Sequence, residues 1–149
     1  MMASVPPTVS TGPSSRRLVR WAWSALGLLL VESLLGVGLN LYAALPSAPS
    51  VAQIFVSVPL LTAHIALAFF LLASTLAYVI VVRRNGVPGV LLRSIAVFLF
   101  VLVAVQEGFA YVFSQNAAFS FGMTVGFVGA VGVQASLLYT LGRQRPAES

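Results

Sequence analysis

The chain has 149 residues, of which 59% are hydrophobic and only 7% are Asp, Glu, Lys or Arg. A soluble domain carries about 25% of these charged residues and could not cover its surface with so few of them. The composition therefore excludes a soluble enzyme or a DNA-binding protein. The net charge of +5 does not indicate a nucleic-acid partner, because the basic residues are spread thinly between long apolar runs. We expect an integral membrane protein in contact with the lipid bilayer.

A bilayer core about 30 Å thick is crossed by about 20 apolar residues of helix. Four stretches meet this requirement, namely residues 21–45, 52–82, 91–113 and 117–141. Because the links between them are short, consecutive helices must be antiparallel neighbours. The expected fold is an all-α, polytopic bundle of four transmembrane helices with up-down-up-down topology.

The four spans fill most of the chain and leave no room for a separate soluble domain. We assign residues 20–142 to one transmembrane domain. Residues 1–19 begin with a stretch rich in Pro, Ser and Thr and are expected to form a disordered cytoplasmic tail. Residues 143–149 are expected to form a second cytoplasmic tail.

The basic residues mark one side of the expected bundle. They precede the first span, flank the link between the second and third spans, and follow the fourth, whereas the other two links carry no charge. The positive-inside rule then predicts a multi-pass protein of the cytoplasmic membrane with both termini in the cytoplasm. These residues are Arg16, Arg17, Arg20, Arg83, Arg84, Arg93, Arg143 and Arg145.

The arginine-rich flank, the apolar run and the small residues at 43–48 also resemble a secretory signal peptide. The apolar segment of such a peptide is usually about 7–15 residues long. Here the run extends over residues 21–45 and contains Glu32. We therefore favour a first span that stays in the protein.

Ionisable side chains at membrane depth are rare, because each costs about 2.5–3.5 kcal/mol to insert. In this sequence they are Glu32, His64 and Glu107, accompanied by the amides of Asn40, Gln106 and Gln134. A rise of about 1.5 Å per residue places His64, Glu107 and Asn40 in one outer layer, with Glu32 about two turns below. Each lies on a stripe that mixes small, polar and aromatic residues, as is typical of an interior helix face. On the second span this stripe is His64, Ala68, Leu71, Thr75 and Tyr78, and on the third it is Phe100, Val103, Glu107, Tyr111 and Ser114.

This polar group has two interpretations. In the first, His64 forms a buried polar cluster with Glu107 or Glu32, with Asn40 at the same level. This cluster would bind a ligand or relay protons, since intramembrane ionisable residues are functional candidates by default. In the second, they bond to one another and hold the bundle together. Interhelical hydrogen bonds in membranes contribute about 0.6 kcal/mol each, so this second role is weak but common.

Met123 is expected near the level of His64, so these two residues are candidate axial ligands of a haem iron. Alternatively, Met123 only fills space in a packed core. The chain has no Cys and a single His, which excludes disulfides, iron–sulfur clusters and zinc–thiolate sites. The residues predict no metal site, and they leave the cofactor open, with haem or a quinone as the possibilities.

The last span carries a ridge of small residues formed by Gly122, Gly126 and Ala130. Glycines four residues apart let a second helix approach closely. The partner helix is either a neighbour in the same bundle or another subunit, as in a homo-oligomer. We favour packing within the chain.

No phosphate-binding loop, dinucleotide fingerprint, zincin motif or nucleophile elbow occurs in the sequence. The set of residues that such chemistry requires is missing, and no catalytic residue is predicted. The sequence therefore favours a protein that is not an enzyme.

Several short motifs occur along the spans, namely Leu34-Leu35-Gly36, Asn40-Leu41-Tyr42 with Pro46, His64, Gly108-Phe109-Ala110-Tyr111 and a Gly- and Met-containing last span. Together they resemble the motifs of an uncharacterised family of small four-span prokaryotic membrane proteins. The likeness covers most of residues 26–141. A first span followed by a His-bearing second span is also distantly similar to one four-helix half of the haem A synthases, which hold haem with His residues on paired helices. That resemblance implies a haem-ligating role for His64.

The function predicted from these observations is a non-catalytic accessory or assembly subunit of a larger membrane complex, such as a respiratory one, with partner subunits in the membrane. One alternative is a redox protein that binds haem or a quinone at His64. The other is a small transporter or channel that uses Glu32 and Glu107.

Overall fold

The computed structural model describes residues 13–42, 50, 58–87 and 89–143. These residues form four long helices and no strand. Each helix is long and apolar enough to cross a membrane. The predicted all-α fold with four membrane-spanning helices is confirmed. The helices are α1 (Pro13–Tyr42), α3 (Pro59–Asn85), α4 (Val90–Ser114) and α5 (Ala117–Arg143).

The first helix begins earlier than the sequence indicated. α1 starts at Pro13, so residues 13–19, which we assigned to a disordered tail, are helical. Proline is well tolerated at the first helical position, where its missing N–H has no intrahelical partner in any case. The extra turns also bury apolar surface, because Leu18 is only 3% exposed. The rest of the predicted tails, residues 1–12 and 144–149, lies outside the described residues.

The second membrane helix begins later than predicted, at Pro59 instead of residue 52. Val58 precedes it with a non-helical backbone, φ −131° and ψ 79°. Proline disfavours the helical conformation in the residue before it, so a helix cannot easily continue through Val58 into Pro59. Residues 51–57, which we expected to be helical, lie outside the described residues.

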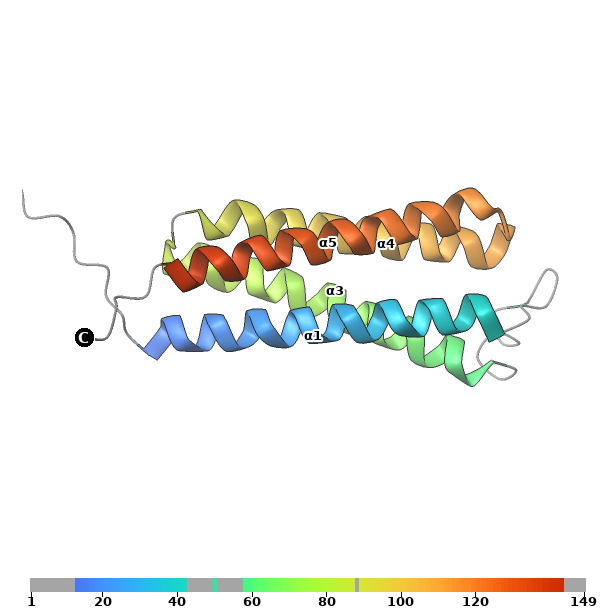
Figure 1. The fold of residues 1–149 in the computed structure, drawn as a ribbon, viewed down its shortest axis with the longest axis horizontal. Coiled ribbons are helices and arrows are strands. Elements are labelled where there is room, and N and C mark those ends of the chain that lie inside the picture. Colours follow the sequence, from blue (N-terminus) through green and yellow to red (C-terminus); the bar gives the residue numbers. More distant parts are fainter. Residues whose placement is uncertain (1–12, 43–49, 51–57, 88, 144–149) are drawn as a thin grey trace, which may run out of the picture.

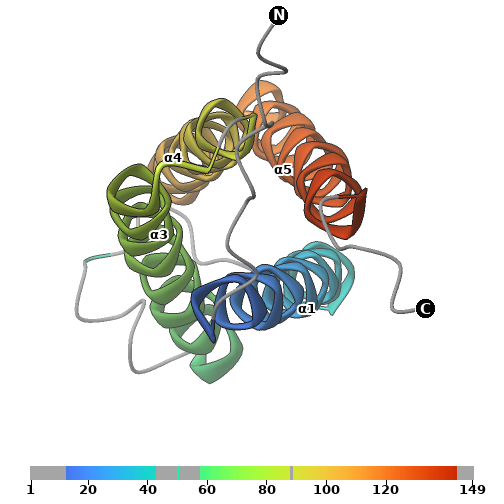
Figure 2. The ribbon, with the colours of Figure 1, turned by 90° about the vertical axis from the view of Figure 1, so that its left-hand side faces the viewer.

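The four helices run along the long axis of the molecule, each antiparallel to the next in the chain (Figure 1). Figure 2 shows them end-on as a ring in the order α1, α3, α4, α5. Among the described residues, each helix packs against its two neighbours in this ring, and no diagonal pair is in contact. The up-down-up-down topology predicted from the short links is therefore confirmed.

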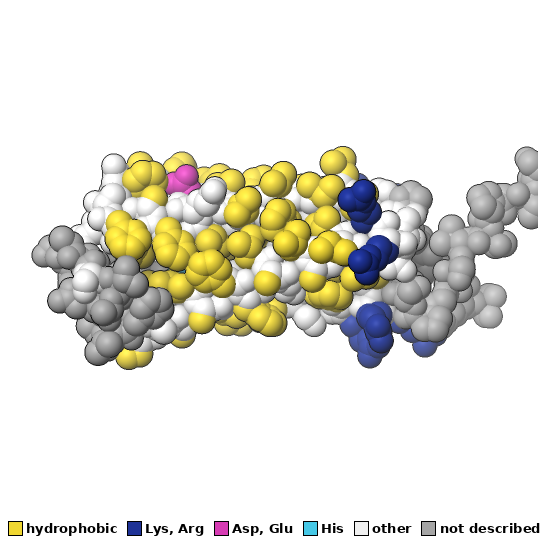
Figure 3. All heavy atoms as spheres, turned by 180° about the vertical axis from the view of Figure 1, so that it is seen from behind, with side chains coloured by type: hydrophobic (Ala, Val, Ile, Leu, Met, Phe, Trp, Pro, Cys, Tyr) yellow, Lys and Arg dark blue, Asp and Glu magenta, His cyan; other side chains and the backbone are white. Residues whose placement is uncertain are grey.

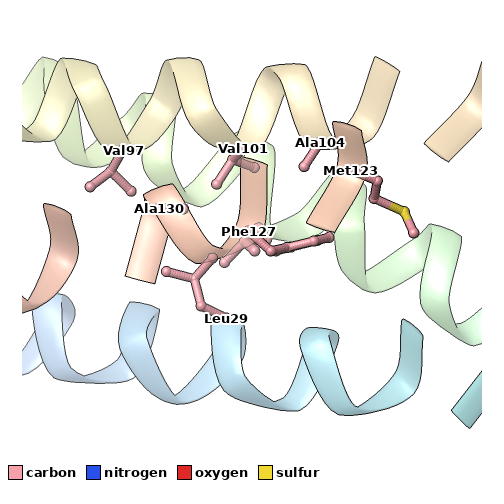
Figure 4. Close-up of a cluster of buried hydrophobic side chains, with 8 residues drawn as sticks. Leu29, Val97, Val101, Ala104, Met123, Phe127 and Ala130 are labelled. Carbon is pink, nitrogen blue, oxygen red and sulfur yellow. The ribbon is translucent and has the colours of Figure 1, made fainter. Parts of the chain in front are cut away.

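Three apolar clusters lie one after another along the inside of the bundle. The first cluster lies at the end of the bundle where the arginine side chains gather, which we call the arginine end. This arginine-end cluster consists of Leu18, Ala22, Tyr78, Val82, Val90, Leu137 and Leu141. The central cluster, shown in Figure 4, consists of Leu29, Leu71, Val97, Val101, Ala104, Met123, Phe127 and Ala130. The far-end cluster consists of Leu39, Leu61 and Val112.

The closest packing joins α4 to α5 through glycine. A Cβ atom on Gly126 would lie 2.9 Å from the Cβ of Ala104 and 3.0 Å from the backbone oxygen of Phe100. A Cβ on Gly122 would lie 2.8 Å from Oε2 of Glu107. Real Cβ atoms do not come so close to other atoms, so glycine is what permits this approach. The small-residue ridge therefore contacts a helix of the same chain, and Ala130 is fully buried in the central cluster.

The interior face of α4 differs from the predicted stripe of Phe100, Val103 and Glu107. The buried positions include Val97, Val101 and Ala104, whereas Val103 is 44% exposed. Phe100 and Glu107 are partly buried and lie against Gly129 and Gly122 of α5. Because α4 is apolar on nearly all sides, its hydrophobic pattern alone does not define its rotation.

The outer surface is that of a membrane protein. Figure 3 shows apolar side chains over the middle of the molecule and arginine side chains gathered at one end. This end is the arginine end named above. Large apolar residues such as Leu34, Leu92 and Phe121 are more than 70% exposed. A soluble protein does not expose apolar surface on this scale, whereas lipid tails cover it in a membrane.

Candidate functional site

A cavity of about 160 Å³ lies inside the bundle, in the half away from the arginine end. All four helices line it, and the lining is mainly apolar and aromatic. Its walls reach the molecular surface at Asn40 of α1 and Phe113 of α4, both of which are exposed. An engineered cavity of about 150 Å³ in another protein binds benzene, so this space suits one six-membered ring.

Two ionisable side chains project into this apolar space from neighbouring helices. Oε1 of Glu32 on α1 lies 3.0 Å from Nδ1 of His64 on α3. Glu32 is fully buried and His64 is 9% exposed. The pair has no net charge whether the proton stays on the carboxyl group or moves to the imidazole. A neutral pair is the form in which such groups are tolerated inside a membrane.

The pair leaves hydrogen-bonding capacity facing the cavity. Both carboxyl oxygens of Glu32 and Nδ1 of His64 are buried without an aligned hydrogen bond. A buried polar atom without a partner costs about 1–3 kcal/mol, so a ligand that supplied one would be held there. Chemically, the pair is able to donate or accept a hydrogen bond, or to move a proton.

Small residues on three helices create the space beside the pair. Gly36 of α1, Ala68 of α3 and Gly108 of α4 all line the cavity. A Cβ on Gly36 would lie 3.4 Å from Cε1 of His64, and one on Gly108 would lie 3.2 Å from Sδ of Met123. A larger side chain at any of these positions would occupy the volume that a ligand needs.

The structure places the polar residues at other levels of the bundle than we predicted. We expected His64, Glu107 and Asn40 at one level and Glu32 two turns below, but Glu32 and His64 are the residues in contact. Trp21 of α1 donates a hydrogen bond to Ser74 of α3, so these two residues mark a common level. From that level the helical rise is about 16 Å to Glu32 and about 15 Å to His64, which places the two side chains side by side. The predicted depths differ because α1 begins at Pro13 and not at residue 21, so that Trp21 lies well inside the bundle.

The other candidate residues divide into two groups. Asn40 and Met123 both line the cavity with Glu32 and His64. Glu107 does not line it, and its side chain lies against Gly122 in the contact between α4 and α5. The structure thus brings Glu32, His64, Asn40 and Met123 together and separates Glu107 from them.

Sequence reasoning missed the aromatic residues that shape the cavity and the role of Gly108 beside them. Phe109 and Phe127 line the cavity together with Gly108. Such residues are abundant in every apolar helix, so their types alone do not distinguish a cavity wall from a lipid contact. Ala68, which also lines the cavity, was expected on the interior face of the second span, because it lies one turn from His64.

Comparison of the chain with known protein families, with curated proteins and with solved structures finds no significant match. The resemblances noted in the sequence therefore stay predictions. Function must be argued from the cavity and its chemistry.

Proposed function

We propose that this multi-pass membrane protein binds a lipid-soluble small molecule that carries a polar ring. The observation that supports the proposal is the buried Glu32–His64 pair at the wall of a ring-sized apolar cavity. Ligand sites in proteins are mostly apolar with a few polar groups that fix orientation, and this cavity has that composition. The ring would occupy the cavity, and its polar substituent would bond to Glu32 or His64.

Of the two cofactors considered, the quinone suits the cavity better. A quinone head group is one six-membered ring with carbonyl oxygens, which accept hydrogen bonds. It matches both the volume of about 160 Å³ and the polar pair. A haem has four pyrrole rings, and it would require the helices to move apart around His64 and Met123. The proposal is therefore a quinone-type ligand, held by hydrogen bonds.

The ligand would reach the cavity from the lipid phase between α3 and α4. Phe109 of α4 lines the cavity and is 38% exposed on the lipid-facing side. Its ring contacts Phe69 of α3, with ring centroids 5.7 Å apart and an angle of 61° between the planes. These two aromatic side chains cover the seam between the helices. A lipid-soluble molecule would pass through this seam without crossing water.

The same geometry gives less support to a transporter or channel. The central cluster and the arginine-end cluster separate the cavity from the arginine end, and the polar side chains between them line only a small separate cavity of about 10 Å³. Glu107, which that hypothesis needed together with Glu32, does not line the cavity. We propose a binding site accessible from one half of the membrane.

Binding is tested with the purified protein in lipid nanodiscs and a short-chain benzoquinone as the probe. Calorimetric titration should give saturable binding to the wild type. His64→Ala and Glu32→Gln should each weaken it by about tenfold or more, the effect of losing about 1.4 kcal/mol. Glu107→Gln is the matched control and should bind as the wild type does. Equal binding by all four proteins, or none by the wild type, would contradict the proposal.

A second candidate is the accessory or assembly subunit predicted from the sequence. What favours it is that nearly all described residues belong to the membrane helices. Such a protein would act through partner subunits, and a bound quinone-type molecule is compatible with a respiratory complex. Purification in mild detergent should then bring down larger membrane subunits, whereas a chain that purifies alone and stable would count against this role.

The positive-inside rule gives the orientation that we propose. The arginine end would face the cytoplasm, and the protein would lie in the cytoplasmic membrane. The cavity would then lie in the outer half of the bilayer.

A further inference from the structure

A second group of buried polar side chains lies between the central cluster and the arginine-end cluster. We call it the inner polar layer, and it consists of Thr75 and Tyr78 of α3, Ser94 of α4 and Gln134 of α5. These side chains are between 2% and 5% exposed. They line a small cavity of about 10 Å³, separate from the larger one. None of them belongs to the site described above.

Three of these side chains donate a hydrogen bond to the backbone. The hydroxyls of Thr75 and Ser94 donate to carbonyl oxygens of their own helices, at 2.9 Å and 2.8 Å. The amide nitrogen of Gln134 donates to the carbonyl of Ala22 on α1, at 2.7 Å. Each hydroxyl oxygen can still accept a hydrogen bond, and so can the amide oxygen of Gln134. The layer is therefore rich in acceptors.

The remaining side chain supplies a donor. The hydroxyl of Tyr78 is buried and has no hydrogen-bond partner among the described residues. Its ring is fixed by an edge-on contact with Trp21, with centroids 5.7 Å apart and an angle of 75° between the planes. Trp21 is itself held by a hydrogen bond from its indole nitrogen to Ser74, at 3.1 Å. The hydroxyl therefore cannot easily turn away to find a partner elsewhere.

We propose that the inner polar layer binds one water molecule. A water needs a space of about 10–15 Å³ and two to four polar partners. It would accept a hydrogen bond from Tyr78 and donate two to the acceptor oxygens of the layer, which matches the donors and acceptors that the site offers. No acidic side chain lines the small cavity, so a cation would be buried without a counter-charge, at high cost.

This water joins the helices to one another. It connects α3, α4 and α5, and the bond from Gln134 to Ala22 adds α1. Apolar clusters lie on both sides of the layer, so the water is shielded from solvent at the arginine end and from the ligand cavity. It fixes the relative positions of all four helices, and it does so whether or not the larger cavity binds a ligand.

Infrared spectroscopy of the protein in nanodiscs tests the proposal. An internal water gives an O–H stretching band that moves to lower frequency when the sample is prepared in H₂¹⁸O, which a protein hydroxyl does not do. The wild type should show such a band, and Tyr78→Phe should lose it. Tyr139→Phe is the control, because Tyr139 is 62% exposed on α5. The absence of an ¹⁸O-sensitive band in the wild type, or its survival in Tyr78→Phe, would overturn the proposal.

A second variant guards against a folding defect in Tyr78→Phe. Ser94→Ala removes one acceptor and leaves the aromatic contact with Trp21 intact, so it should shift the frequency of the band while the helix content is unchanged. An unshifted band in this variant would place the water elsewhere and would overturn the proposal.

A sodium ion is the alternative occupant of the inner polar layer. A melting temperature that rises with NaCl but not with choline chloride would show that the layer holds a sodium ion, and would also overturn the proposal.

Discussion

Glu32 of α1 and His64 of α3 face each other across the bundle interior, with Oε1 and Nδ1 3.0 Å apart. Removing one member of a buried pair leaves the other without compensation, whereas replacing both with apolar residues is often neutral. We predict that Glu32→Leu and His64→Leu each destabilise the protein by about 1–3 kcal/mol. The double variant should recover most of this loss. Thermal unfolding in detergent, analysed as a double-mutant cycle, measures the coupling.

The control for this cycle is Glu107→Leu, because Glu107 lies on Gly122 and away from His64. Its effect should add to that of His64→Leu without coupling. If Glu32→Leu and His64→Leu were also additive, the two side chains would not interact in the folded protein.

Ala68 provides a way to close the cavity without touching the polar pair. It lines the cavity one turn from His64. We predict that Ala68→Leu fills the space and reduces benzoquinone binding by at least about tenfold, while the melting temperature stays close to that of the wild type. Ala66→Leu, on the exposed face of α3, is the matched control and should leave binding unchanged. Equal binding by both variants would mean that the ligand does not occupy this cavity.

The fold was more predictable from the sequence than the site was. Hydropathy and link length decide the number and direction of the helices, because the bilayer sets their length and short links set their neighbours. They do not decide how a helix is rotated when it is apolar on most sides. This is why Val103 was expected inside and is 44% exposed.

The pairing of Glu32 with His64 depended on small differences in helix length and tilt. Both residues were recognised from their chemistry, since ionisable groups inside a membrane are unusual. The sequence left open whether His64 pairs with Glu107 or with Glu32. The expected depths did not decide between them, because α1 begins at Pro13, before the expected boundary of the span. The inner polar layer was predicted only in part. Thr75 and Tyr78 were expected on the interior face of the second span and Gln134 at membrane depth, but Ser94 was not singled out. Only the packing of α4 on both α3 and α5 brings these residues to one level.

The contact between α4 and α5 should be sensitive to a single methyl group. Gly126→Ala places a Cβ within 3.1 Å of three atoms of α4. Overpacking of this kind costs about 1–3 kcal/mol. It outweighs the gain of about 0.5–1 kcal/mol that alanine brings to a helix. We predict a lower melting temperature for this variant.

Gly132→Ala is the matched control on the same helix, because no atom lies within 4 Å of the added Cβ. Here only the helix propensity changes, so this variant should be as stable as the wild type or slightly more stable. A Gly126→Ala protein that melts no lower than Gly132→Ala would show that α4 and α5 are packed less closely.

The proposed orientation can be tested by cysteine labelling, since the natural chain has no cysteine. Asn116 lies between α4 and α5 at the end away from the arginines, and Arg84 lies at the arginine end of α3. We predict that a membrane-impermeant maleimide labels Asn116→Cys in intact cells. Arg84→Cys should react only after the cells are broken. The reverse pattern would place the arginine end outside.

The aromatic pair at the seam between α3 and α4 should control how fast a ligand reaches the cavity. Phe69 is 50% exposed, and its ring contacts Phe109, which lines the cavity. Removing the ring opens the seam without removing the Glu32–His64 pair, so Phe69→Ala should raise both the association and the dissociation rate of the benzoquinone several-fold. The dissociation constant should change by less than about twofold, because a change in gating alters both rates together.

Stopped-flow measurements in nanodiscs compare this variant with Phe70→Ala, a lipid-exposed control on the same helix. Unchanged rates in Phe69→Ala, with binding otherwise intact, would place the route elsewhere while leaving the binding site itself in place.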